Sequence, residues 1–285
     1  FYADNRTAGR TTGNTAIGYE SLKGSSTAAN NTGINNTSIG YRSMISNTSG
    51  HDNVGIGIDV LYNNTIGSNN VSIGTSALYS NTSGNTNIAI GDGALYNNTT
   101  AEGNTSIGAG SMFNNTTGYQ NTAYGLVSLI NNTTGIHNTA IGYAASGGNI
   151  SAEKNVSLGF FALNLNSTGS YNTALGSEAG ITNSTGANNI FLGKGADVTL
   201  GNLSYATAIG TGATVSTSNT MVFGAQTNTT KWAFGRPTTS YALQVGNTTS
   251  DGNGAYLSTG GTWTNGSSRD FKEDFEELNG EEILN

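Results

Sequence analysis

The chain has 285 residues, of which 9% are charged and 42 are glycine, with one proline, no cysteine and a formal net charge of −7. This composition excludes a disulfide framework and a cysteine-ligated zinc site, and the lack of a basic stripe argues against nucleic-acid binding. No apolar run reaches the length that spans a membrane, so we expect no membrane insertion of this chain.

One short phrase, NTAIG or a close variant, returns at a fixed interval through most of the sequence. Gly18 precedes the regular series by 22 residues, and Gly224 follows it by 14. A period held this strictly indicates one supersecondary unit per repeat, with neighbouring units burying one another's apolar faces. In the regular series the closing glycines are 17 residues apart at every step: Gly40, Gly57, Gly74, Gly91, Gly108, Gly125, Gly142, Gly159, Gly176, Gly193 and Gly210.

The columns of this repeat predict an all-β fold, a parallel β-roll or β-solenoid. An apolar residue, mostly Ile, stands one position before the glycine, and Val, Ile or Thr stands three before it. This alternation predicts a short strand with its apolar side inward. We expect two short strands per repeat, since 17 residues cannot hold two helices and their turns. A second candidate core column lies four residues after the glycine: Met44, Leu61, Leu78, Leu95, Met112, Leu129 and Leu163.

Asparagine occupies two more columns, four residues before the glycine and seven after it. A second glycine usually follows three residues after the later column. Stacked Asn side chains can hydrogen-bond to one another, and Asn tolerates the left-handed backbone of a tight corner. We therefore expect both columns to be structural, and we expect the second glycine to close a turn where φ is positive.

Changes in the pattern divide the chain into four segments. We expect a lead-in at residues 1–13, the β-roll at 14–226 and a β-rich connector at 227–266. Residues 267–285 are rich in charge, so we expect a short helical segment that ends partway into a further domain. The helical spacing there is that of Phe271, Phe275, Leu278 and Ile283.

The NTAIG phrases and the segment TAIGTGATVSTSNTMVFGA resemble the head repeats of trimeric autotransporter adhesins. The resemblance covers most of residues 14–226. It implies a left-handed parallel β-roll and a homotrimeric fibre of three chains side by side. The step from Gly210 to Gly224 matches that family's usual repeat length, whereas the 17-residue step is longer. Each turn is therefore expected to carry a longer corner loop.

The tail GSSRDFKEDFEELNGEEIL resembles the start of the intramolecular chaperone domain that ends phage tailspikes and tail fibres, including endosialidases. That resemblance implies trimer assembly followed, in many members, by self-cleavage that uses a Ser and a Lys five residues later. Ser267 and Lys272 have this spacing, although Ser268 stands where the family often has Asp. The chemistry requires a nucleophilic hydroxyl beside a lysine that acts as base.

Two columns are candidate binding surfaces. One column stands eight residues after the glycine and is interpreted either as an ice-binding ladder or as a series of hydroxyl-capped turns. Its residues are Thr48, Thr65, Thr82, Thr99, Thr116 and Thr133. Tyr62, Tyr79, Tyr96 and Phe113 stand five residues after it, next to the core column, and so point away from the core. They could bind sugar rings or pack between the chains of a trimer.

These observations predict an extracellular, homotrimeric, adhesive fibre on a cell surface or a virion tail, which binds a cell-surface glycan or protein receptor. We expect no enzyme activity beyond self-cleavage of the full-length protein, and no cofactor. His51 and His137 lack Cys or acidic partners at ligand spacing, so we expect no metal. The alternatives are a tailspike-type polysaccharide depolymerase with an inter-chain site and an ice-binding solenoid.

Overall fold

The computed structural model describes residues 12–225 and, beyond them, the strands at 232–234, 243–245, 255–257 and 263–264. The chain divides into two units, 1–225 and 226–285. The predicted helical segment at 267–285 and most of the predicted lead-in lie outside the described residues.

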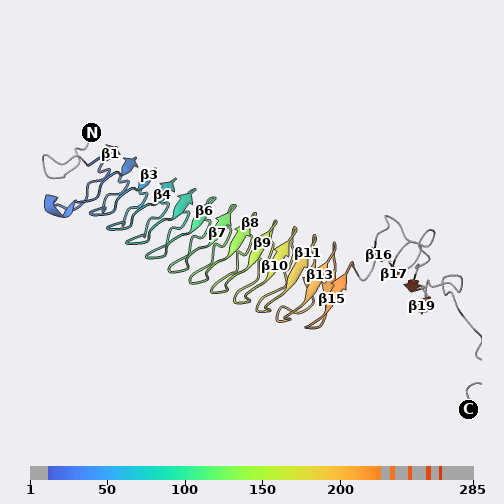
Figure 1. Cartoon of the computed structure of the whole chain (residues 1–285). Helices are drawn as coiled ribbons and strands as arrows, with labels where there is room; N and C mark the ends of the chain where they lie inside the picture. Colours follow the sequence, from blue (N-terminus) through green and yellow to red (C-terminus); the bar gives the residue numbers. More distant parts are fainter. Residues whose placement is uncertain (1–11, 226–231, 235–242, 246–254, 258–262, 265–285) are drawn as a thin grey trace, which may run out of the picture. The chain divides into compact units, whose positions relative to one another are not determined.

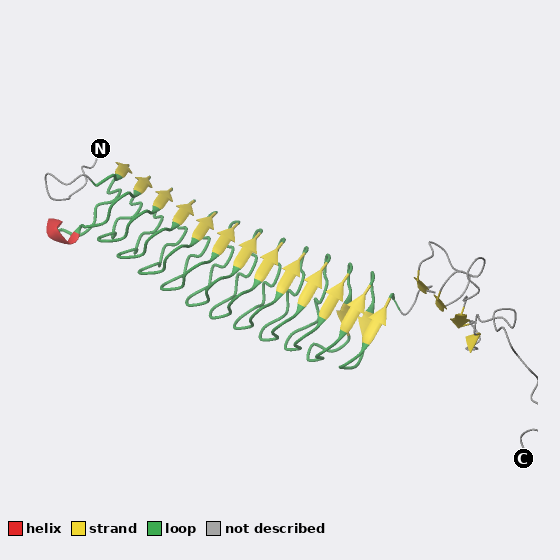
Figure 2. Cartoon of the chain, in the orientation of Figure 1, coloured by secondary structure: helices red, strands yellow, loops and turns green. Residues whose placement is uncertain are grey.

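The first unit is a parallel β-solenoid of 17-residue turns, as the repeat predicts (Figures 1 and 2). Its strands form one 13-stranded sheet in which each residue pairs with its counterpart in the next turn, as Val54 pairs with Val71. The strands are β1 (Thr15–Ile17), β2 (Thr37–Ile39), β3 (Val54–Ile56), β4 (Val71–Ile73), β5 (Ile88–Ile90), β6 (Thr105–Ile107), β7 (Thr122–Tyr124), β8 (Thr139–Ile141), β9 (Val156–Leu158), β10 (Thr173–Leu175), β11 (Ile190–Leu192), β13 (Thr207–Ile209) and β15 (Met221–Phe223).

The side of each solenoid turn that lies opposite the strand is built from tight backbone turns, and we call it the turn side. The N–H of Ala94 donates to the carbonyl of Gly91, and Tyr96 donates to Gly93, both at 3.3 Å. Alternate residues here have positive φ, which no extended strand allows. Within residues 12–225, this side becomes a strand only at β12 (Asp197–Val198) and β14 (Thr214–Val215). The prediction of two strands in every repeat was therefore wrong for most of the turns, and it holds only where β12 and β14 form.

The interior of the roll is thin, and this reverses the predicted orientation of the strands. The middle residue of nearly every strand is small and buried, as in Ala89 and Ser106, while its apolar neighbours point outward. The predicted Leu and Met column fills the core from the turn side and is 0% exposed from Met44 to Leu163. Only a small residue fits opposite it: a Cβ on Gly55 would come within 2.8 Å of the Met44 side chain.

Phe191 illustrates the same limit on the volume of the interior, with the large residue on the strand and the small one opposite it. It is the one large aromatic residue among the buried strand centres in the described part of the chain. In the preceding turn, the position that Leu or Met usually occupies is Gly180, and a Cβ there would overlap the Phe191 ring. The large and small residues have exchanged sides, so the roll keeps its thickness.

Two ladders of buried Asn side chains run along the solenoid at the corner before the strands, as predicted. The N–H of Asn104 donates to Asn87 Oδ1 at 3.0 Å, and its Nδ2 donates to the carbonyl of Gly118 at 2.9 Å. In the second ladder, Asn98 Nδ2 donates to Asn81 Oδ1 at 2.9 Å. Neither ladder has positive φ, so side-chain hydrogen bonding, and not a left-handed backbone, requires Asn there.

Glycine is required in the two glycine columns for different reasons. Gly108, at the end of β6, has a φ of 133°, and a Cβ there would overlap the carbonyl of Gly125. Gly118, three residues after an Asn of the second ladder, does not have positive φ, so that prediction was wrong. Its Cβ would overlap Gly135 and the amide of Asn115, because the turns approach closely at this corner.

The smaller elements complete the description. The long insertion between Gly18 and Gly40 contains a short 3-10 helix, η1 (Ala28–Asn30). In the second unit, β16 (Trp232–Phe234) pairs in parallel with β17 (Leu243–Val245), and β18 (Ala255–Leu257) and β19 (Trp263–Thr264) continue the sheet antiparallel.

Asn104→Ala should lower the free energy of unfolding by about 1–3 kcal/mol, because the buried N–H of Asn121 loses its acceptor. Urea unfolding followed by circular dichroism measures this loss. Asn202→Ala, at an exposed position, is the control and should stay within about 0.5 kcal/mol of the wild type. Equal losses in the two variants would contradict the role given to the ladder.

Two glycine substitutions should separate backbone strain from steric overlap. Gly195 has a φ of 61°, and a Cβ at this position would have no other atom within 4 Å, so Gly195→Ala should cost about 1 kcal/mol. Gly108→Ala adds overlap with the next turn and should cost about 3 kcal/mol or more. Similar melting temperatures for the two variants would show that turn spacing does not constrain this column.

Candidate functional site

The outward side chains of the 13-stranded sheet form a long, mostly apolar surface, in which Thr occupies about half of one column, and we call it the sheet face. These residues come from the two columns that flank each buried strand centre, and they repeat along the whole sheet. A contiguous apolar surface of this kind marks an interaction site. The large side chains that are at least 36% exposed here are Ile17, Ile56, Ile88, Tyr124, Val156, Leu158, Leu175, Ile190, Leu192, Met221 and Phe223.

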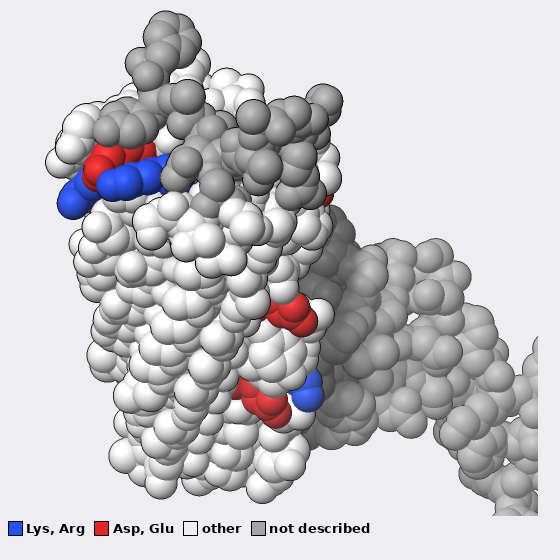
Figure 3. Space-filling model, turned by 90° about the vertical axis from the view of Figure 1, so that its left-hand side faces the viewer, with Lys and Arg blue, Asp and Glu red and all other residues white. Residues whose placement is uncertain are grey.

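Charged side chains are sparse on the roll. Figure 3 shows the described surface from one side, where a few small groups of Asp, Glu, Lys and Arg residues interrupt a mostly uncharged surface. A partner that bound along the roll would therefore be recognised through apolar contacts and through amide and hydroxyl groups more than through long-range electrostatics.

The four predicted aromatic residues form one ladder on the turn side, which we call the aromatic ladder. Ring centroids lie 5.0 Å apart from Tyr62 to Tyr79, 5.0 Å from Tyr79 to Tyr96 and 4.8 Å from Tyr96 to Phe113. The rings are within 10° of parallel. Each side chain is half-buried, whereas the neighbouring core column is fully buried, so the two columns point in opposite directions as predicted.

Arg42 covers the first ring of the aromatic ladder. Its guanidinium lies 5.0 Å from the Tyr62 ring centroid and 4.9 Å from that of Tyr41. Two hydrogen bonds of 2.8 Å, from Nε and Nη2 to the carboxylate of Asp59, fix its position. This arrangement gives the ladder a cationic end, held by a bidentate ion pair.

Stacking determines what the aromatic ladder offers to a ligand. Because each ring covers the face of its neighbour, ring edges and tyrosine hydroxyls are the groups that point outward. A sugar would contact those edges and hydroxyls, and the binding role of the four residues stays a prediction. Burial, reinforced by Tyr62 and Tyr96, raises the pKa of Tyr79 above its ordinary value of 10.0.

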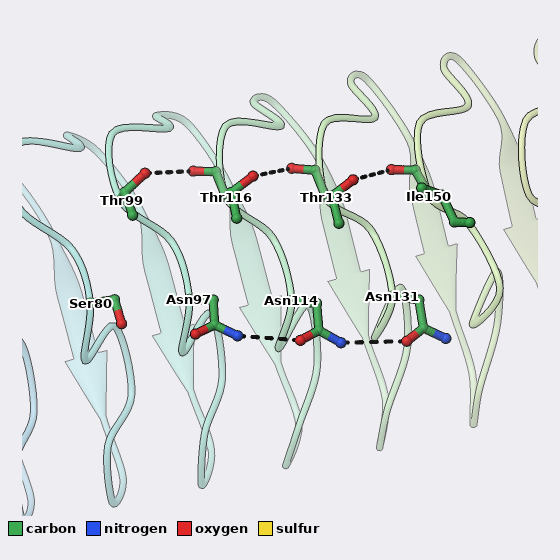
Figure 4. Close-up of a pocket in the computed structure, with 8 residues that line it drawn as sticks. All are labelled: Ser80, Asn97, Thr99, Asn114, Thr116, Asn131, Thr133 and Ile150. Carbon is green, nitrogen blue, oxygen red and sulfur yellow. Dashed lines mark hydrogen bonds between the residues drawn. The ribbon is translucent and has the colours of Figure 1, made fainter.

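A groove of about 670 Å³ runs beside the aromatic ladder, and we call it the amide groove. Figure 4 shows its two walls as parallel rows that cross successive turns. One wall contains Ser80, Asn97, Asn114 and Asn131, each one residue after the aromatic column or its Ile130 continuation, and the other contains Thr99, Thr116, Thr133 and Ile150.

Both walls are ordered by hydrogen bonds between turns. Asn97 Nδ2 donates to Asn114 Oδ1 at 3.2 Å, and Asn114 Nδ2 donates to Asn131 Oδ1 at 3.4 Å. On the other wall, Thr99 Oγ1 donates to the carbonyl of Thr116 at 3.2 Å, and Thr116 and Thr133 repeat this pattern at 3.0 Å. The threonine hydroxyls therefore cap the turns, as one of the two interpretations of their column predicts.

A second polar cluster lies at the corner before the strands. Tyr119 and His137 meet edge to face with centroids 5.4 Å apart. In the next two turns, Lys154 Nζ donates to the hydroxyl of Tyr171 at 3.0 Å, and that hydroxyl lies 3.3 Å from Glu153 Oε1. The hydrogen bond to Tyr171 and the charge of Glu153 raise the pKa of Lys154.

The structure describes only part of the residues on which the catalytic and metal predictions depend. Ser267 and Lys272 lie outside the described residues. Across the part of the chain that the structure describes, no group of three or more His, Cys, Asp or Glu side chains could hold a metal ion. In the same part, no helix has the length and hydrophobicity needed to cross a membrane.

No protein-family model matches the chain, and a search of curated proteins finds no significantly similar sequence. Function is therefore inferred from two surfaces of the roll, the sheet face and the turn side.

Sequence reasoning missed both the exposure of the sheet face and the amide groove. In the sequence, the Asn wall is the first Asn of the pair NN at Asn97, Asn114 and Asn131. The second Asn of each pair belongs to the buried ladder, and only that structural role was predicted from the sequence. The exposed Ile column was assigned to the core because alternation identifies two faces without saying which one is inside.

Alkaline pH should destabilise the wild type more than Tyr79→Phe. The folded-state pKa of Tyr79 lies above 10.0, so the unfolded chain releases its proton first as the pH rises. Stability is therefore full below about pH 10 and falls through the window above it. Thermal melts at about pH 8 and about pH 10.5 measure the difference. Equal losses in the two proteins would contradict the assigned environment.

Proposed function

We propose that the chain forms an extracellular, homotrimeric adhesive fibre, in which copies pack side by side through the sheet face and present the turn side to a cell-surface receptor. The observation that carries this proposal is the row of exposed Ile, Val and Leu side chains along the whole sheet. Water contact with such a surface costs roughly 25 cal/mol for each Å² that a partner could bury.

A second copy of the same chain is the partner that this surface fits. From β2 to β13 the sheet face repeats every 17 residues, so its ideal complement is a surface with the same period and length. Parallel copies place each Ile column beside an identical one. Closed cyclic symmetry then buries the face of every copy and leaves none exposed.

The proposal of three chains per fibre is based on the two resemblances in the sequence. The NTAIG repeats resemble heads of trimeric autotransporter adhesins, and the tail from Gly266 resembles a chaperone domain that assembles trimeric phage fibres. Under this proposal, Ser267 and Lys272 perform self-cleavage in the full-length protein, and the fibre belongs to a virion tail or a cell surface. Among the described residues, no comparable observation favours the depolymerase or ice-binding alternatives.

Replacing Ile56 and Ile88 together by Glu should convert the trimer to a monomer, because charges on the sheet face cannot be buried without partners. Light scattering after size-exclusion chromatography of the full chain measures the mass, and the wild type should have three times the mass of one chain. Ile66→Glu is the control: Ile66 is 54% exposed but lies outside the strands, so this variant should remain trimeric. A monomeric wild type would overturn the proposal.

A further inference from the structure

We propose that the amide groove binds an extended, uncharged polysaccharide whose chain lies parallel to the solenoid axis, along two walls of four residues each. This proposal deepens the adhesive function above and rests on it for the biological setting. It names the binding site, the class of ligand and the direction in which the ligand lies.

The position of the groove is compatible with the fibre. Ser80 follows Ser72, the buried centre of β4, by eight residues, which is about half of a 17-residue turn. The groove therefore lies on the side of the roll opposite the sheet face. In Figure 4 the two walls stand in front of the strands, on the turn side. Packing of copies through the sheet face leaves this side open to solvent.

The chemistry of the walls selects the ligand. An asparagine amide has two N–H groups and an oxygen with two lone pairs, and the ladder between Asn97 and Asn131 uses one of each along its length. The N–H groups and lone pairs that these bonds do not use supply both donors and acceptors to a ligand in the groove. No lining residue is charged, and the threonine methyl groups and Ile150 add apolar contact. A neutral ligand rich in hydroxyl groups matches this set.

The spacing of the walls selects an extended polymer. Three successive turns repeat the same Asn and Thr pair, and the rings beside them recur every 4.8 to 5.0 Å. This interval, which is close to the spacing of neighbouring strands at about 4.8 Å, is also close to the advance of an equatorially linked pyranose chain per sugar. Successive sugars can therefore meet equivalent groups on successive turns, and a coiled glucan would lose this register.

A peptide is a poorer fit, because the backbone at the groove is already paired. The N–H groups of Asn97 and Asn114 donate to the carbonyls of Phe113 and Ile130, both at 3.0 Å, and Thr99 donates to Thr116. An incoming peptide strand would find no open backbone edge to extend. The side-chain amides, in contrast, are suited to hydroxyl groups.

The groove is also confined to one part of the roll. The wall position six residues after the glycine is Asn in three consecutive turns, but it becomes Gly148 and Leu165 in the next two. Fold alone does not require Asn there, because Ser46 and Ser80 occupy the same position in other turns. This restriction distinguishes the wall from the buried Asn ladders, which run through nearly every turn.

Isothermal titration of the full chain with cello-, xylo-, manno- and malto-oligosaccharides tests the proposal. At least one of the extended, equatorially linked series should bind, with affinity that rises with length to the tetramer and then levels off. Malto-oligosaccharides, which coil, should bind at least about tenfold more weakly, and added salt should leave the affinity unchanged because no charge is involved. Absence of binding by all the extended series, or equal binding of the malto series, would overturn the proposal.

The triple variant Asn97→Ser, Asn114→Ser, Asn131→Ser locates the site. Serine occurs naturally at this position, so the fold should persist, and the affinity should fall by about tenfold or more as the amide contacts are lost. Asn63→Ser makes the same change in the same column outside the groove and should bind like the wild type. Wild-type affinity in the triple variant would place the glycan elsewhere.

The mass of each sample separates this proposal from the function on which it rests. A trimeric wild type that binds no extended oligosaccharide overturns the groove and leaves the fibre standing. A monomeric wild type overturns the fibre, whether or not the groove binds sugar.

Discussion

The spacing between turns is the constraint on which this structure depends. Each residue lies directly beside its counterpart 17 positions later, and the backbone carbonyl of one turn is the acceptor for the next. The two buried Asn ladders hold that spacing at the corner, since Asn98 and Asn104 each hydrogen-bond both to the Asn of the preceding turn and to a nearby backbone carbonyl, and the other Asn residues of the ladders make similar bonds. Positions where the turns approach most closely, such as Gly108 and Gly118, leave no room for a side chain.

The repeat in the sequence was enough to predict the parallel solenoid, its core column and its Asn ladders. Those features follow from period and chemistry alone: a column of Leu and Met needs burial, and a column of Asn can pair with itself. The shortened step from Gly210 to Gly224 also contains β14, which pairs with β12 in the preceding 17-residue turn.

The orientation of the strands could not be predicted in the same way. Alternation of Ile with Ser or Ala normally places Ile inside, but the Leu and Met column already fills this thin roll. The decision depends on the distance between the two sides of a turn, which no single column of the sequence records. The same missing distance explains why the reason for Gly118 was misassigned, and why the amide groove was not recognised.

The consequence is a molecule with two outer surfaces of opposite character. The sheet face is apolar and continuous, and it suits an identical copy. The turn side is built from stacked rings, amides and hydroxyls, and it suits a polar ligand. A fibre needs both properties, because assembly and recognition must not compete for one surface. The 17-residue turn supplies them on opposite sides of a single short repeat.

The most direct test of this account is disulfide formation between copies of the full chain, which has no cysteine of its own. Ile107→Cys places a thiol on the sheet face at the end of β6, and Ile66→Cys places one outside the sheet. Under mild oxidation, Ile107→Cys should form covalent dimers through identical residues, because packed copies bring equivalent positions together in register, while Ile66→Cys should stay unlinked. Efficient linking of Ile66→Cys with none for Ile107→Cys would contradict packing through the sheet face.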